Sequence, residues 1–158
     1  MWRHDWFSYE QYQVVHRSFM DRLRNEGVVE RDTLSFHESE DAEGELALVV
    51  LRGRVICSGE VVIRVDKKLM VKRDSHNRWV VKTRFYQYHA WRRNRAGRGR
   101  RDLLRIDNAH RAKLHRHIFD SAGIETEVVD FELEQMPSLD EFIREAVELA
   151  SNPAPRPE

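Results

Sequence analysis

The segment from Trp79 to Trp91 constrains the fold more strongly than any other part of the chain. Its side chains alternate in character: odd positions include Trp79, Val81, Phe85 and Trp91, and even positions include Lys82, Arg84, Tyr86 and Tyr88. Alternate side chains of a strand point to opposite sides of a sheet, so one side of this segment can enter a core. We therefore predict a long β-strand whose second face, with two basic residues and two tyrosines, is exposed.

Shorter apolar and β-branched segments on either side predict further strands. They cover residues 46–51, 55–57, 61–65, 69–72, 103–106 and 126–133. Ser58-Gly59 and Ser75-His76-Asn77 are typical of the turns that close hairpins, and the acidic stretch 38–45 is expected to be a loop. Because the strands follow one another without intervening helices, we expect an antiparallel sheet of about five to six strands.

Helix signals stand at both ends of this strand-rich region. Ser8-Tyr9-Glu10-Gln11 has the pattern of a capping box and predicts a helix over residues 8–26, before Gly27. A second such box begins at Ser138, and an apolar stripe follows it at helical spacing: Leu139, Phe142, Ile143, Ala146, Val147 and Ala150. We therefore predict an α+β fold as a single domain over residues 1–152, with a disordered proline-rich tail at 153–158.

Composition narrows the class of protein. The chain has 158 residues, of which 41% are hydrophobic, and none of its apolar runs is long enough to cross a bilayer. Its first residues lack the pattern of a signal peptide, and Cys57 is the single cysteine, which excludes an intrachain disulfide and a cluster of thiolate ligands. We expect a cytoplasmic protein without membrane contact.

The net charge of zero conceals a division along the chain. Residues 67–116 contain 17 Lys and Arg against 3 Asp and Glu, a local charge of +14, and the remaining residues carry −14. A concentrated positive potential attracts polyanions. Two interpretations stay open at this level: either a polyanion binds this segment, or the acidic and basic segments pair with each other after folding.

Two groups of side chains favour RNA as the polyanion. The first is the strand face already described, where cations could hold phosphates and tyrosines could stack bases. The second is an arginine-rich hairpin tip with Arg92, Arg93, Arg95, Arg98, Arg100 and Arg101, whose guanidinium groups match phosphate geometry. The alternatives are an ordinary solvated strand for the first group and an acidic protein partner for the second.

A polar cluster follows the hairpin tip, with Arg105, Asp107, His110, His115 and His117. Two histidines can act as base and acid, and an arginine can stabilise charge that develops on a phosphate. RNA cleavage needs little more, because the ribose 2′-hydroxyl is the nucleophile. A metal ion held by Asp107 and the three histidines is one alternative, and a turn with solvated histidines is another.

Three consecutive motifs carry a resemblance to a known family. They are the aromatic run 85–91, the run 103–110 that contains Arg105-Ile106-Asp107-Asn108, and His115-Arg116-His117. This order resembles the TumE-type toxin family of bacterial toxin–antitoxin pairs, over about residues 78–150. Arg105, Asp107, Asn108, His115 and His117 fall on positions of the family's motifs. The resemblance implies a toxin that acts on RNA and is neutralised by a cognate antitoxin protein.

The sequence thus predicts a toxin-like, metal-independent endoribonuclease that needs no cofactor. Its alternative is a non-catalytic module that binds nucleic acid or a protein partner through the same basic surface. In the catalytic hypothesis, His115 or His117 deprotonates the 2′-hydroxyl and the other protonates the leaving oxygen. Arg105 would brace the phosphate and Asp107 would orient a histidine.

Overall fold

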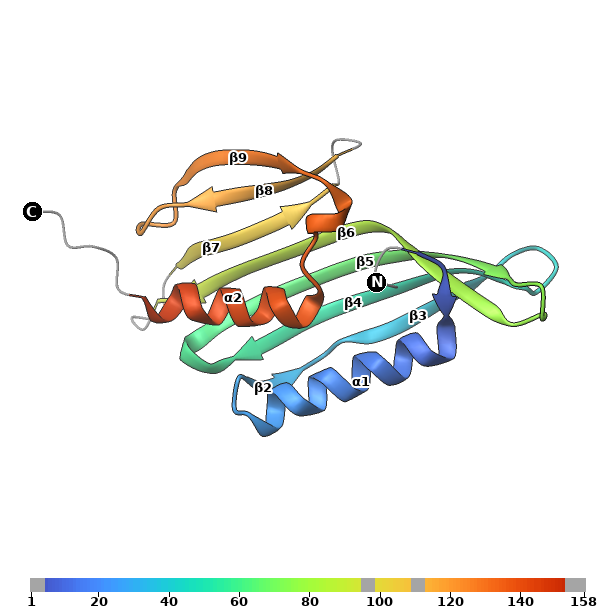
Figure 1. The fold of residues 1–158 in the computed structure, drawn as a ribbon. Helices are drawn as coiled ribbons and strands as arrows, with labels where there is room; N and C mark the ends of the chain where they lie inside the picture. Colours follow the sequence, from blue (N-terminus) through green and yellow to red (C-terminus); the bar gives the residue numbers. More distant parts are fainter. Residues whose placement is uncertain (1–4, 95–98, 109–112, 153–158) are drawn as a thin grey trace, which may run out of the picture.

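The fold is a large antiparallel sheet with both helices on one of its faces (Figure 1). A computed structural model describes residues 5–94, 99–108 and 113–152. The strands in these residues are β1 (Phe7–Ser8), β2 (Val29–Asp32), β3 (Ser35–Glu40), β4 (Leu46–Cys57), β5 (Val61–Arg73), β6 (Trp79–Arg93), β7 (Arg100–Asp107), β8 (Leu114–Phe119) and β9 (Glu125–Phe131). The helices are α1 (Tyr9–Asn25) and α2 (Leu139–Ser151), with short 3-10 turns at Ser58–Glu60 and Leu133–Gln135.

Hairpins build most of the sheet. Its strand order is β2-β4-β5-β6-β7-β8-β9, so every strand from β4 onward pairs with the next one in sequence. β3 follows β2 along the same edge of β4, and the short β1 pairs with the start of β6. The turns predicted at Ser58-Gly59 and Ser75-His76-Asn77 close the β4–β5 and β5–β6 hairpins, as expected.

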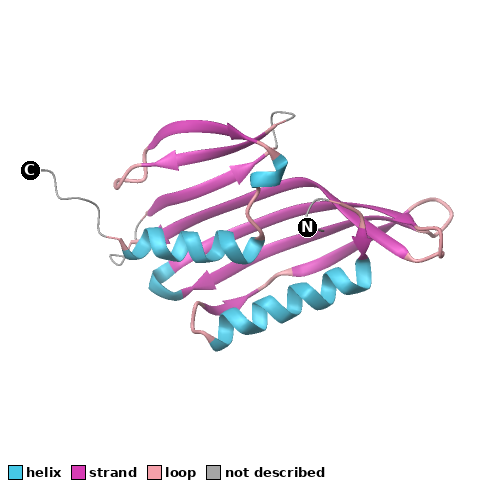
Figure 2. Cartoon of the chain, in the orientation of Figure 1, coloured by secondary structure: helices cyan, strands magenta, loops and turns pink. Residues whose placement is uncertain are grey.

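The core lies between the sheet and the two helices (Figure 2). α1 begins where the Ser8 side chain accepts a hydrogen bond from the Gln11 amide, and α2 begins with a full capping box at Ser138. Phe142 and Ile143 of α2 are fully buried, and the Phe142 ring lies 5.3 Å from that of Tyr88 on β6. Both predicted helices are confirmed, and they leave the opposite face of the sheet without a helix among the described residues.

The sheet has nine strands rather than the five to six predicted. Residues 46–51 and 55–57 join into one strand, β4, and residues 61–65 and 69–72 join into β5. The expectation of a loop from residue 38 is wrong at its start, because β3 extends to Glu40 as an exposed partner of β4. β3 is acidic and lacks an apolar alternation, so its pairing depends on the strand beside it.

A β-bulge at Arg84 changes which side chains of β6 face the core. Lys68 of β5 pairs with Phe85, but the next residue of β5 pairs with Thr83, so Arg84 has no partner there. Before the bulge Val81 and Lys82 point to opposite faces, as predicted, although Lys82 is half-buried rather than exposed. After it the phase reverses, because one extra residue turns every later side chain to the other face.

The predicted exposure of Tyr86 and Tyr88 is therefore wrong. The two tyrosines are only 3% and 1% exposed and lie on the side of the helices, whereas Phe85 lies beside Lys68 on the other face. Neither tyrosine is available to stack a base on the helix-free face.

Candidate functional site

The predicted cluster forms where β7 and β8 pair. Asp107 lies directly opposite His115, and Arg105 lies directly opposite His117. These four side chains share one face of the sheet, since cross-strand partners point the same way. It is the face away from α2, because the intervening Arg116 points the other way and pairs with Glu145 of that helix.

Asp107 is the centre of the cluster. Its side chain is fully buried, and its Oδ2 accepts a hydrogen bond from Arg105 Nε at 2.6 Å. His115 Nε2 lies 3.0 Å from Asp107 Oδ1, and His117 Nε2 lies 3.6 Å from Asp107 Oδ2. The two imidazole rings are 5.0 Å apart between centroids. One carboxylate thus brings together Arg105 and both histidines, as the sequence predicts, and His110 lies outside the described residues.

The second nitrogen of each ring has its own oxygen partner. His115 Nδ1 lies 3.3 Å from the carbonyl oxygen of Lys113, and His117 Nδ1 is close to the carboxylate of Glu125. A carbonyl and an ionised carboxylate only accept hydrogen bonds, so both Nδ1 atoms act as donors. Both Nε2 atoms therefore point toward Asp107 rather than toward solvent.

This orientation bears on the predicted acid–base pair. The side chains of His115 and His117 are 5% and 14% exposed, and His117 Nε2 is itself buried without a hydrogen-bond partner among the described residues. A general acid or base must reach the proton that it transfers. The arrangement is better suited to hold a cation between the rings and Asp107 than to present both rings to a substrate.

A row of cationic and histidine side chains crosses the helix-free face and ends in this cluster, with which it shares two residues. Five directly paired positions on the consecutive strands β4 to β8 form it: Arg54, Arg64, His89, Arg105 and His117. At the usual distance between strands the row is roughly 20 Å long. We call these five residues the cationic row.

Arg54, Arg64 and His89 are the residues of the row that our sequence analysis missed. Arg54 and Arg64 face each other across β4 and β5, and both are exposed. Among the described residues, no carboxylate lies within ion-pair distance of either one. Like charges directly opposite each other destabilise a sheet, so the pairing of these two arginines does not itself support the fold. The available signal in the sequence was a basic residue beside each of two short apolar runs, Arg54 before 55–57 and Arg64 after 61–63.

Histidine 89 occupies the middle of the cationic row. Its Nε2 lies 2.8 Å from Asp102 Oδ1. Burial lowers the pKa of His89, and the Asp102 carboxylate opposes that shift only in part. Nearby, Arg54 and Arg100 stack on the ring of Trp91, at 5.7 and 4.6 Å from its centroid. This stacking orders both cations, of which Arg100 also lies 3.6 Å from Asp102 Oδ1.

The other predicted RNA-binding residues are divided between the two faces. Arg84 is exposed on the helix-free side, where its guanidinium contacts Met70 at 3.6 Å. Arg93 is exposed at the end of β6, whereas Arg92 donates to the carbonyl of Ala150 in α2 and Arg101 to that of Ser121. Arg95 and Arg98 lie outside the described residues, so the arginine tip as a whole stays a prediction.

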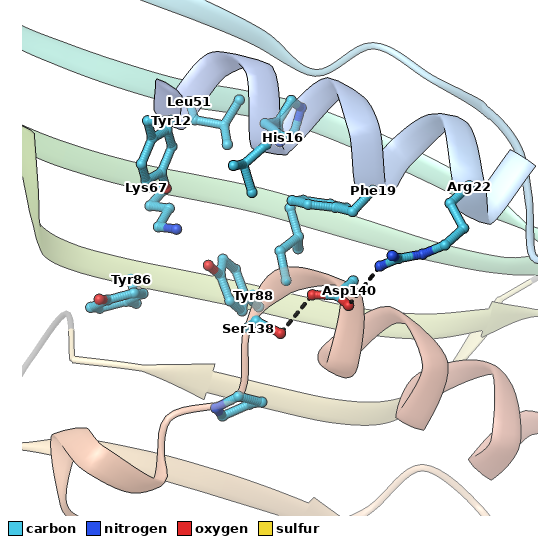
Figure 3. A pocket seen from close by; sticks show the side chains of 13 residues that line it. Tyr12, His16, Phe19, Arg22, Leu51, Lys67, Tyr86, Tyr88, Ser138 and Asp140 are labelled. Carbon is cyan, nitrogen blue, oxygen red and sulfur yellow. Dashed lines mark hydrogen bonds and ion pairs between the residues drawn. The ribbon is translucent and has the colours of Figure 1, made fainter. Parts of the chain in front are cut away.

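A second polar site lies on the helix side, in a cavity of about 170 Å³ between α1, α2 and the sheet (Figure 3). The ammonium group of Lys67 points into it and lies 5.1 Å from the ring of Tyr12 and 5.5 Å from that of Tyr86. Burial alone would lower the pKa of Lys67, but Tyr12, Tyr88 and Tyr86 outweigh it and the pKa is raised. Lys67 thus stays charged and explains why two tyrosines of β6 tolerate the core.

No protein-family model, curated protein or solved structure matches the chain. Fold and site together define an α+β protein whose sheet has one face covered by helices and one face that presents the cationic row. None of the helices in the described part of the chain has the length and apolarity to cross a lipid bilayer.

Proposed function

We propose that the helix-free face of the sheet binds single-stranded RNA. The observation that carries this proposal is the exposed, unneutralised pair Arg54 and Arg64 in the cationic row. Two like charges held opposite each other lower the stability of the fold, and a bound phosphate would relieve their repulsion by neutralising charge. Of its five positions, three are arginines, Arg54, Arg64 and Arg105, and Arg105 is paired with Asp107.

A partly exposed aromatic side chain on the same face, Phe85, favours RNA over an acidic protein. Phe85 is partly exposed next to Lys68, whose ammonium group lies 5.1 Å from the ring centroid. A sheet surface that combines cations and flat rings suits unpaired bases, which stack on the rings while their phosphates meet the cations. Phe85 takes the stacking role that the sequence had suggested for Tyr86 and Tyr88.

The binding proposal is tested with a fluorescent single-stranded RNA and anisotropy at several salt concentrations. The variant Arg54→Gln/Arg64→Gln should weaken binding and lower the salt slope by about 0.7 for each lost phosphate contact. The matched control is Arg17→Gln/Arg22→Gln, which removes two exposed arginines from α1 on the other face. Equal loss in both variants, or preferential binding of an acidic peptide, would contradict the proposal.

RNA cleavage by a toxin that an antitoxin neutralises is the second candidate function. The observation in its favour is the cluster around Asp107, which lies at the end of the cationic row. In this proposal the 2′-hydroxyl attacks the adjacent phosphate, the bond to the 5′-oxygen breaks, and a 2′,3′-cyclic phosphate results. The 2′-hydroxyl gives its proton to water, and the 5′-oxygen that leaves takes up a proton from water. Arg105, with a side chain 28% exposed, would stabilise the charge on the phosphate.

Cleavage is tested on an RNA with a single 2′-deoxy sugar at the position that is cut. The deoxy substrate should resist cleavage and still bind, and Arg105→Gln should lose at least about a hundredfold in rate. Normal cutting of the deoxy substrate would exclude this mechanism. An RNA that binds but stays intact would leave the non-catalytic binding module as the function.

A further inference from the structure

We propose that Asp107, His115 and His117 form a binding site for a divalent transition metal ion of the zinc type. The three ligand atoms lie within 4.8 Å of one another, and Asp107 is fully buried. The site is a property of the protein alone and does not rest on RNA binding. It departs from the metal-independent mechanism that the sequence predicts and takes up the alternative that the histidine cluster left open.

The hydrogen bonds of the two rings carry this inference. Each Nδ1 donates to an oxygen, the Lys113 carbonyl for His115 and the Glu125 carboxylate for His117. Metal-binding histidines nearly always donate their second N–H to a carboxylate or carbonyl in this way, which fixes the ring and leaves the other nitrogen free for the metal. Here both remaining nitrogens converge on the same carboxylate.

The converging atoms repel one another unless a proton or a metal cation lies between them. An unprotonated Nε2 presents a lone pair, and so does each carboxylate oxygen. His117 Nε2 is buried and has no hydrogen-bond partner in the described part of the chain, although Asp107 Oδ2 is only 3.6 Å away. Leaving such an atom unpaired in a protein interior is costly. A metal ion would satisfy His117 Nε2 and would take the place of the direct contact between His115 Nε2 and Asp107 Oδ1.

The distances agree with a metal of this size. Zinc bonds of about 2.0 to 2.2 Å in tetrahedral geometry place neighbouring ligand atoms about 3.3 to 3.6 Å apart. His115 Nε2 lies 3.0 Å from Asp107 Oδ1, somewhat closer than this, and His117 Nε2 lies 3.6 Å from Asp107 Oδ2, at the upper end of the range. Arg105 holds Asp107 Oδ2 at 2.6 Å and thereby orients the carboxylate. Small shifts of side chains would therefore be enough for binding.

The ligand set also selects the kind of ion. Two imidazoles with one carboxylate suit zinc, iron, cobalt or nickel, whereas magnesium and calcium prefer oxygen ligands. Three protein ligands leave at least one coordination position for water or a substrate oxygen. The site would thus add a Lewis acid at the end of the cationic row, close to where Arg105 could meet a phosphate.

The experiment is a titration of the full chain, without a histidine tag and stripped by chelator, with Zn²⁺ in a calorimeter and Co²⁺ in a spectrophotometer. We expect one ion per chain, a cobalt spectrum with imidazole ligation, and no comparable affinity for Mg²⁺. His115→Gln and His117→Gln should each weaken binding by more than about a hundredfold, beyond the loss usual for an orienting partner. His89→Gln, which alters another paired histidine of the same face, should bind as wild type does.

An exposed partner provides a variant that does not threaten folding. Glu125, with a side chain 46% exposed, orients His117 only from its outer nitrogen. Glu125→Ala should weaken Zn²⁺ binding by about ten- to a hundredfold, and Glu127→Ala, an exposed residue of the same strand, should have no effect. Absence of one-to-one binding by the wild type would overturn the proposal. So would unchanged affinity in both His117→Gln and Glu125→Ala.

Discussion

At the scale of single residues, two titratable side chains that line the cavity between the helices and the sheet, Lys67 and His16, differ in charge. Lys67 stays charged in the cavity because three tyrosines surround it. His16 of α1 lies beside the same cavity, 8% exposed, with its ring 5.1 Å from that of Phe19 and 5.3 Å from that of Phe36. Burial lowers the pKa of His16 to about 4, and the nearby charge of Lys67 adds to the shift.

Histidine 16 should make the protein sensitive to acid. Its pKa is about 4 in the folded chain and near 6.5 in the unfolded chain, so the unfolded state binds the proton first as the pH falls. The free energy of unfolding should therefore drop between pH 6.5 and 4, by at most about 3 kcal/mol from this residue. Urea unfolding at several pH values measures it.

The matched variants for this prediction are His16→Phe and His37→Gln. The first keeps the aromatic contacts and removes the titrating group, so most of the loss between pH 6.5 and 4 should disappear. The second removes an exposed histidine of β3 and should leave the pH dependence as it is. The same acid sensitivity in His16→Phe as in the wild type would refute the assignment.

At the scale of elements, local signals in the sequence predict what they directly encode. The capping residues Ser8 and Ser138 mark the two helices, and the turns near Gly59 and Asn77 mark two hairpins. The bulge at Arg84 escapes such reasoning, because it arises from the register between β5 and β6 rather than from any turn residue. Because of this single extra residue, the sequence predicts the wrong face of the sheet for both tyrosines of β6.

The candidate site shows the same limit. The motifs correctly predict that Arg105, Asp107, His115 and His117 come together, since they lie near the ends of consecutive segments. The role of Glu125 could not be predicted, because it depends on how β9 pairs with β8. The cationic row likewise requires the register of five strands, which alternation within one strand does not specify.

At the scale of the whole molecule, part of the divided charge is neutralised within the chain, and binding of a polyanion stays a proposal. Arg73 pairs with Glu45 and Arg116 with Glu145, so some of the basic segment is neutralised by acidic residues from outside it. Arg54 and Arg64 are exposed, lack such partners among the described residues and lie before that segment, whereas Arg84 and Arg93 are exposed without an ion pair inside it. The pairing of the strands, rather than closeness in sequence, brings the residues of the cationic row together on one face. The helices cover the other face and form the core with it.

The central claim is that this face exists to bind RNA, and Arg64→Gln tests it most directly when stability and affinity are measured on the same variant. Removing one of two opposed arginines should leave the free energy of unfolding unchanged or raise it by up to about 1 kcal/mol, while the RNA dissociation constant rises and its salt dependence weakens. A substitution that weakens RNA binding without lowering stability identifies a side chain that contributes to binding rather than to the fold. Unchanged RNA affinity and salt dependence in a folded Arg64→Gln protein would contradict the account.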